Sequence, residues 1–134
     1  MTHLLDTNVC IRFLNNSIPM LTARILACLP PSIVLCDIVK AELYYGAEHS
    51  SAPEKNLRNL DEFLAGFLSL PFDGRAARIY GRIKSILARR GEPIGPNDLL
   101  IAAIALANEV TLVSHNTAEF ARIDGLDIED WELP

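Results

Sequence analysis

The sequence lacks any apolar run long enough to cross a membrane. Its longest purely apolar stretch, Leu99 to Ala107, spans nine residues, whereas a membrane-spanning helix needs about 20. The first residues carry no lysine or arginine and reach an acid at Asp6, which is unlike a secretory signal peptide. We therefore expect a protein that neither enters nor crosses a membrane.

Cysteine is scarce and is not arranged for cross-linking. The three cysteines, Cys10, Cys28 and Cys36, are odd in number and form no Cys-x-x-Cys pair. This excludes a disulfide framework and a zinc site as the basis of the fold. Small buried thiols of this kind are typical of a reducing compartment, so we expect a cytoplasmic protein.

Positive charge is in the minority, yet half of it is concentrated in one segment. With 17 acidic and 12 basic residues the net charge is −5, which argues against a protein that coats nucleic acid. Residues 74–91 nevertheless contain no acid and six bases: Arg75, Arg78, Arg82, Lys84, Arg89 and Arg90. Most of these arginines fall on one side of a helix. Such a row is a solvated face, a set of phosphate contacts or a protein-docking surface.

Length and composition fit one folded domain. The chain has 134 residues, of which 50% are hydrophobic, and this is enough for a substantial core. A multidomain enzyme with a separate cofactor domain is excluded at this length. We expect residues 1–134 to form a single domain.

Short apolar runs alternate with longer helical patterns along the chain. The expected strands are 3–5, 33–36, 110–114 and 127–128, with a brief extended piece at 70–72. The expected helices are 9–14, a helix from Pro19 through Leu29, 37–48 with Asp37 as its cap, 53–68, 75–90 with Asp73 as its cap, a helix that starts at 95–97, and 116–120. This alternation predicts an α/β fold in which a short parallel β-sheet is flanked by helices on both faces.

Carboxylates recur at the expected strand ends, where ligands bind to parallel sheets. Asp6 ends the first strand, Glu42 lies in the helix after the second, and Asp98 opens a very apolar helix. Asn116 and Glu119 follow the last clear strand. Each acid alone has an ordinary explanation, such as a helix cap, a favourable position in the helix dipole or a solvated helix face.

Taken together, these acids favour a metal site. Glu42 lies close to an apolar helix face and Asp98 adjoins Leu99, and buried carboxylates are rare unless they are paired or bound to metal. Mg²⁺ takes oxygen ligands, and Mn²⁺ uses the same set. A metal held in this way generates hydroxide from water and stabilises negative charge on phosphate, which is the chemistry of phosphodiester hydrolysis.

Five short motifs occur in a fixed order along the chain. They are Leu-Leu-Asp-Thr-Asn at 4–8, Ala-Glu-Leu-x-x-Gly at 41–46, Pro-x-Asp-Leu-Leu-Ile-Ala-Ala at 96–103, Asn-Thr-x-Glu-Phe at 116–120 and Glu-Asp-Trp at 129–131. In this order and spacing they resemble the PIN-domain ribonucleases of the VapC toxin type. The resemblance implies a parallel-sheet fold and Mg²⁺- or Mn²⁺-dependent cleavage of RNA, with tRNA anticodon loops as one expected target. It also implies a cognate antitoxin, and a homodimer or a toxin–antitoxin hetero-oligomer.

The resemblance also implies roles for individual residues. Asp6, Glu42 and Asp98 match the family's metal-binding acids. Asn116 stands where many members have an aspartate, and Glu119 stands one turn further on. Both are therefore expected in the catalytic set, and which of them completes the site stays open.

Two further groups of residues are expected near this site. Thr7 and Ser114 are expected to hold site waters, and the expected RNA contacts are Arg75, Arg78 and Arg82. His115 lies near the expected site, so a minor role there is left open for it. The other two histidines are expected to be solvated or hydrogen-bonded.

The alternative is a non-catalytic signalling or binding module that resembles a receiver domain. Such a domain also combines a parallel sheet, an acidic pocket and Mg²⁺. It usually has a second acid beside the acid of its first strand and a lysine after a late strand. Here the late strand ends Ser114-His115-Asn116, and Lys40 lies in a helix.

Overall fold

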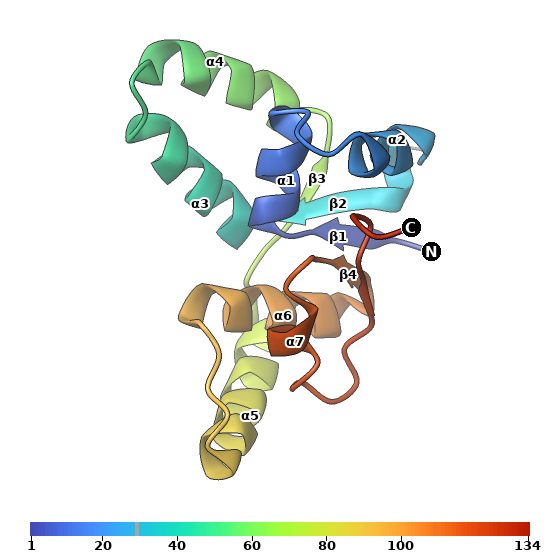
Figure 1. Cartoon of the computed structure of the whole chain (residues 1–134). Coiled ribbons are helices and arrows are strands. Elements are labelled where there is room, and N and C mark those ends of the chain that lie inside the picture. The colour runs from blue at the N-terminus through green and yellow to red at the C-terminus, as the bar shows by residue number, and fades with distance from the viewer. Residues whose placement is uncertain (29) are drawn as a thin grey trace.

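Five strands form a parallel sheet at the centre of the molecule (Figure 1). The computed structural model describes residues 1–28 and 30–134. Across the sheet the strands are β3 (Leu68–Leu70), β2 (Ile33–Cys36), β1 (His3–Leu5), β4 (Thr111–Val113) and β5 (Ile128–Glu129). Leu4 of the central strand pairs with Val34 on one side and with Leu112 on the other. The expected parallel α/β fold is confirmed.

The direction of strand order changes at β1. From β1 the chain proceeds outward through β2 to β3, and it then returns to place β4 and β5 on the other side. The ends of β1 and β4 therefore lie side by side, with Leu5 opposite Val113 and the Asp6 N–H donating to the Val113 carbonyl at 3.1 Å. In open parallel sheets this change of direction is the place where ligands bind.

Helices cover both sides of the sheet (Figure 1). On one side lie α1 (Thr7–Leu14) and α2 (Pro19–Ala27), and on the other lie α5 (Gly74–Arg90) and α6 (Pro96–Asn108). A hairpin of α3 (Asp37–Glu48) and α4 (Pro53–Leu64) projects beside them, and α7 (Thr117–Phe120) precedes β5. The expected helical position of Leu29 lies outside the described residues, which resume with a 3₁₀ turn at Pro30–Ser32.

Short polar residues and glycine set several helix ends, as expected. Asp6 caps α1 by accepting from the Val9 N–H at 2.9 Å, and Asp73 caps α5 by accepting from the Ala76 N–H at 3.0 Å. Gly91 ends α5 at φ +67°, a backbone conformation that glycine adopts without strain. Asp37 was wrongly expected to cap α3, because the extended residue before that helix is Cys36. The Asp37 carboxylate instead accepts from Ser69 Oγ at 2.6 Å.

The helix expected at 53–68 is shorter than predicted. It ends at Leu64, and Leu68–Leu70 forms the edge strand β3, where Leu68 pairs with Val34. The apolar spacing continues through Phe67 and Leu68 as it would in a helix, so the predicted helix was carried on to residue 68. Pairing with the open edge of β2 supplies backbone hydrogen bonds that the periodicity does not reveal.

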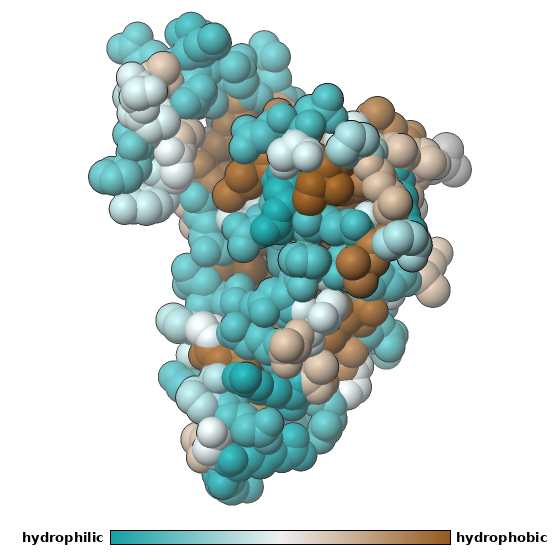
Figure 2. All heavy atoms as spheres, viewed as in Figure 1, coloured by the Kyte–Doolittle hydropathy of each residue, from teal (hydrophilic) through white to brown (hydrophobic). Residues whose placement is uncertain are grey.

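The core surrounds the sheet, and α6 contributes more buried residues to it than any other helix of the described residues. This helix is buried on almost every side, with Ile101, Ala102, Ala103, Ile104 and Ala105 all at 0% exposure, so its sequence shows an unbroken apolar run. Figure 2 shows a mainly hydrophilic face on which apolar residues form separate patches. Within the described residues, none of the helices is both long enough and apolar enough to span a membrane.

Candidate active site

Asp6 lies at the switch point between β1 and β4. Only 6% of the residue is exposed, and burial raises the pKa of its carboxyl. Hydrogen bonds from Ser114 and from the Val9 N–H oppose that rise in pKa. Capping of α1 engages Oδ1, so Asp6 combines the ordinary role of a cap with a place at the expected ligand-binding edge.

Glu42 connects three helices. Its Oε1 accepts from Thr7 Oγ1 of α1 at 2.6 Å, and its Oε2 accepts from Asn97 Nδ2 of α6 at 3.4 Å. Thr7 therefore orients the Glu42 carboxylate directly. Asn97 was missed by the sequence analysis, although its position next to Asp98 in the first turn of α6 was the available indication.

Asp98 is surrounded by other carboxylates. Its pKa rises to about 6, first because the side chain is half-buried and then because of the negative charges on Glu119, Asp6 and Glu42. A hydrogen bond with Glu119 adds to this rise in pKa. The structure thus brings together four acids that are separated by up to 113 positions in the sequence, from Asp6 to Glu119.

Glu119 is held in the ionised form by donors. The Gly95 N–H donates to its Oε1 at 2.7 Å and the Asn116 side-chain amide donates to its Oε2 at 3.0 Å. These bonds, with the Asn116 amide the largest effect and the nearby Arg122 charge a smaller one, lower the pKa of Glu119. Asn116 thus presents its amide to Glu119 and orients that carboxylate toward Asp98.

A second group of ligand-type side chains lies beside Asp6. His115, Asp130 and Glu132 each offer one atom, and these atoms lie within 4.8 Å of one another. His115 Nδ1 is 2.9 Å from Asp130 Oδ2, and Arg12 pairs with Glu132 at 3.1 Å. Both carboxylates in this group already have protein partners, since Asp130 also accepts from the Glu132 N–H at 3.0 Å. The sequence analysis did not predict it, apart from the possible minor role of His115.

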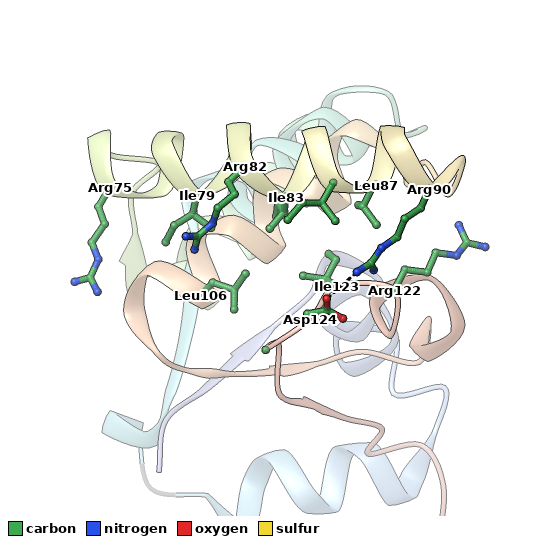
Figure 3. Close-up of a pocket in the computed structure, with 12 residues that line it drawn as sticks. Arg75, Ile79, Arg82, Ile83, Leu87, Arg90, Leu106, Arg122, Ile123 and Asp124 are labelled. Atoms are coloured by element: carbon green, nitrogen blue, oxygen red, sulfur yellow. Dashed lines mark hydrogen bonds and ion pairs between the residues drawn. The ribbon is translucent and has the colours of Figure 1, made fainter.

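The expected basic row on α5 divides into two parts. Arg75 and Arg82 line a cleft between α5 and residues 122–125, together with Arg90 (Figure 3). Arg78 is exposed but does not line this cleft. We call this feature the α5 cleft. Arg75, Arg82 and Arg90 border this cleft, whereas Arg78 and Arg89 do not, although all five arginines are exposed.

The acid site suits a hard cation by its donor chemistry. All of its carboxylates offer oxygen ligands, and burial together with the negative charges around Asp98 makes ionisation of Asp98 more costly. A divalent cation relieves this repulsion and prefers such ligands. Asp6, Glu42, Asp98 and Glu119 are therefore the residues that fit a metal.

Comparison with known proteins agrees with this architecture. A model of the PIN domain matches residues 3–126. A protein from Shigella flexneri, "tRNA(fMet)-specific endonuclease VapC", is 38% identical over 96% of both chains, and "Ribonuclease VapC2" from Rickettsia felis is 36% identical over 98% of this chain and 99% of its own. The structure of DNA-bound VapBC from Salmonella typhimurium superposes with a TM-score of 0.91, at 38% identity and 98% coverage of each chain. None of these comparisons supports the receiver-like alternative.

Proposed function

Since this chain belongs to the PIN-domain family, we propose that it is a metal-dependent endoribonuclease and the toxin of a toxin–antitoxin pair. We treat residues 1–134 as one PIN domain. The observation that carries the proposal is the meeting of four carboxylates at the switch point of the sheet, where burial, followed by the charges of the other three, raises the pKa of Asp98 to about 6.

Asp6, Glu42 and Asp98 are the proposed ligands of Mg²⁺ or Mn²⁺. When bound, the metal supplies a Lewis acid and an activated water for attack on phosphorus. Glu119 is the proposed fourth carboxylate, because Asn116 and Gly95 both donate to it and hold it near Asp98. Asn116 is then a positioning residue.

The surrounding residues hold this set of ligands in place. Thr7 fixes one oxygen of Glu42, and the Gly95 N–H fixes one oxygen of Glu119. Asp98 and Glu119 share a hydrogen bond that raises the pKa of Asp98 and lowers that of Glu119. Below about pH 6 the proton of this pair therefore resides on Asp98, and it must leave before Asp98 acts as a ligand.

RNA is the proposed substrate class. One similar protein is a tRNA(fMet)-specific endonuclease and another is a ribonuclease, so tRNA is the first substrate to test. Arg75 and Arg82 are proposed phosphate contacts, because arginine pairs with phosphate through its planar fork.

An antitoxin is the proposed protein partner, since the similar Salmonella structure is of a VapBC complex. A groove of about 440 Å³ lies between α1, α3 and α4, and it extends from the exposed Ile11 and Leu14 to Glu42. A partner segment in this groove would bury apolar surface and reach a catalytic carboxylate. We propose that the chain forms a homodimer or a toxin–antitoxin hetero-oligomer in the cytoplasm.

The decisive experiment is cleavage of a purified tRNA pool by the purified chain, followed by sequencing of the new 5′ ends. We expect cleavage to stop in EDTA and to return with Mg²⁺ or Mn²⁺, because all proposed ligands are oxygen. Asp98→Asn should lose cleavage, whereas the exposed Asp127→Asn should keep it. Full cleavage in EDTA would refute the metal mechanism.

A further inference from the structure

The α5 cleft combines an apolar floor with a basic rim. Its volume is about 590 Å³, within the usual range for ligand pockets. Ile83, Leu106 and Ile123 contribute to the floor, and Arg75 and Arg82 stand at the rim (Figure 3). An apolar floor beneath guanidinium groups suits a ligand that has both a flat apolar part and negative charge.

The charges of this cleft are unbalanced. Arg90 pairs with Asp124 at 3.0 Å, but among the described residues neither Arg75 nor Arg82 has a carboxylate partner. The helix that carries them contains no acid, in a chain with a net charge of −5. The cleft is thus complementary to a polyanion, and it is set apart from the acidic remainder of the molecule.

One end of the cleft adjoins the acid site. Arg122, which lines this cleft, donates to the Pro93 carbonyl at 2.9 Å. Two residues after Pro93, the Gly95 N–H holds Glu119, and the charge of Arg122 itself lowers the pKa of Glu119. A linear substrate that leaves the acid site therefore meets the cleft next, with Arg75 at the far end of α5.

We propose that the α5 cleft binds a single-stranded segment of RNA that continues from the cleaved bond. Its phosphates contact Arg75 and Arg82, and one unstacked base covers Ile83 and Leu106. This inference rests on the proposed ribonuclease function. It adds an extended RNA-binding surface, here called the track, that contacts several nucleotides beyond the cleaved bond. It also distinguishes Arg75 and Arg82 from Arg78, which the sequence alone places on the same face.

The test measures binding of fluorescein-labelled single-stranded RNA, 12 or 4 nucleotides long, by anisotropy. The full chain carries Asp98→Asn and Mg²⁺ is present, so that cleavage does not consume the probe. The test variant adds Arg75→Gln and Arg82→Gln. The matched control adds Arg78→Gln and Arg89→Gln, which make the same change of charge on the same helix outside the cleft.

Loss of two phosphate contacts should weaken binding of the 12-nucleotide RNA about 25-fold at 0.1 M salt and reduce the slope of log affinity against log salt by about 1.4. Binding of the 4-nucleotide RNA, which reaches only the acid site, should change little. The control pair should cost less than about threefold, because exposed charges outside the contact are screened. Thermal melts check that all variants are folded.

Three results would overturn the proposal. Equal losses of affinity for the 12-nucleotide RNA in the test and control variants would mean that the charge of the whole helix attracts RNA and that the α5 cleft is not a specific binding site. Unchanged binding of the 12-nucleotide RNA by the test variant would show that the α5 cleft does not bind RNA. If sedimentation velocity shows that the parent is a dimer and the test variant is a monomer, the α5 cleft would instead be the contact with a second copy of the chain. Cleavage by the parent chain is scored separately, so failure of the nuclease proposal is distinguishable from failure of the track.

Discussion

Replacing Asp98 by asparagine should stabilise the metal-free protein. The pKa of Asp98 is about 6 rather than the ordinary 3.8, so its ionisation is harder in the folded chain than in the unfolded chain. This difference in pKa lowers the free energy of unfolding of the parent by at most about 3 kcal/mol at neutral pH. Because the side chain is only half-buried, solvent screening reduces this figure to about 1–2 kcal/mol.

The helix dipole acts in the opposite direction. Asp98 lies in the first turn of α6, where a negative charge is favourable by about 0.3–1 kcal/mol. The expected net gain in the free energy of unfolding for Asp98→Asn is therefore about 1 kcal/mol at pH 7.5 in EDTA. The folded chain binds the proton more tightly, so the parent loses stability as pH rises from about 4 to 6, and the gain from the substitution should vanish near pH 4.

Urea unfolding followed by circular dichroism measures this difference. With Mg²⁺ at a hundredfold excess over its dissociation constant, the parent should gain about 2.7 kcal/mol, and Asp98→Asn should gain much less. Asp127→Asn is the matched control, since this exposed aspartate should change stability by less than about 0.5 kcal/mol. A destabilised Asp98→Asn in EDTA, or an Mg²⁺ gain equal to that of the parent, would refute the view that Asp98 is a repelled metal ligand.

Two further predictions concern the same acids. Glu42→Gln should lose most RNA cleavage while its urea midpoint in EDTA stays within about 1 kcal/mol of the parent, because an amide still accepts from Thr7 and fits a helix equally well; a strongly destabilised variant that cleaves RNA would remove Glu42 from the site. Affinity for Mg²⁺, measured by thermal shift, should weaken as pH falls below about 6, because protonated Asp98 must release its proton to bind metal. A constant affinity between pH 5 and 7.5 would contradict the assignment of Asp98 as a ligand.

Local pattern and residue chemistry were sufficient to predict most of the fold. The buried strands β1, β2 and β4 are short apolar runs because helices cover both faces of the sheet, and Asp6, Asp73 and Gly91 mark helix ends by their own geometry. The extended piece expected at 70–72 lies two residues too late, because the edge strand β3 (Leu68–Leu70) is fixed by its long-range pairing with β2. No local spacing rule contains that information.

In the candidate site, too, local motifs predicted some features, whereas others depend on long-range packing. The acids were selected from their motifs, but the hydrogen bond from Asn97 to Glu42 and the amide of Asn116 directed at Glu119 depend on how α3, α6 and α7 pack. The sequence likewise placed Arg75 and Arg78 on one helical face. Only the packing of residues 122–125 against α5 distinguishes them.

The central position of β1 has a consequence for synthesis of the chain. This strand leaves the ribosome more than 100 residues before β4, which is one of its two neighbours in the sheet. Asp98 and Glu119, too, are made long after Asp6. A nascent chain therefore holds no complete acid site until Glu119 has left the ribosome.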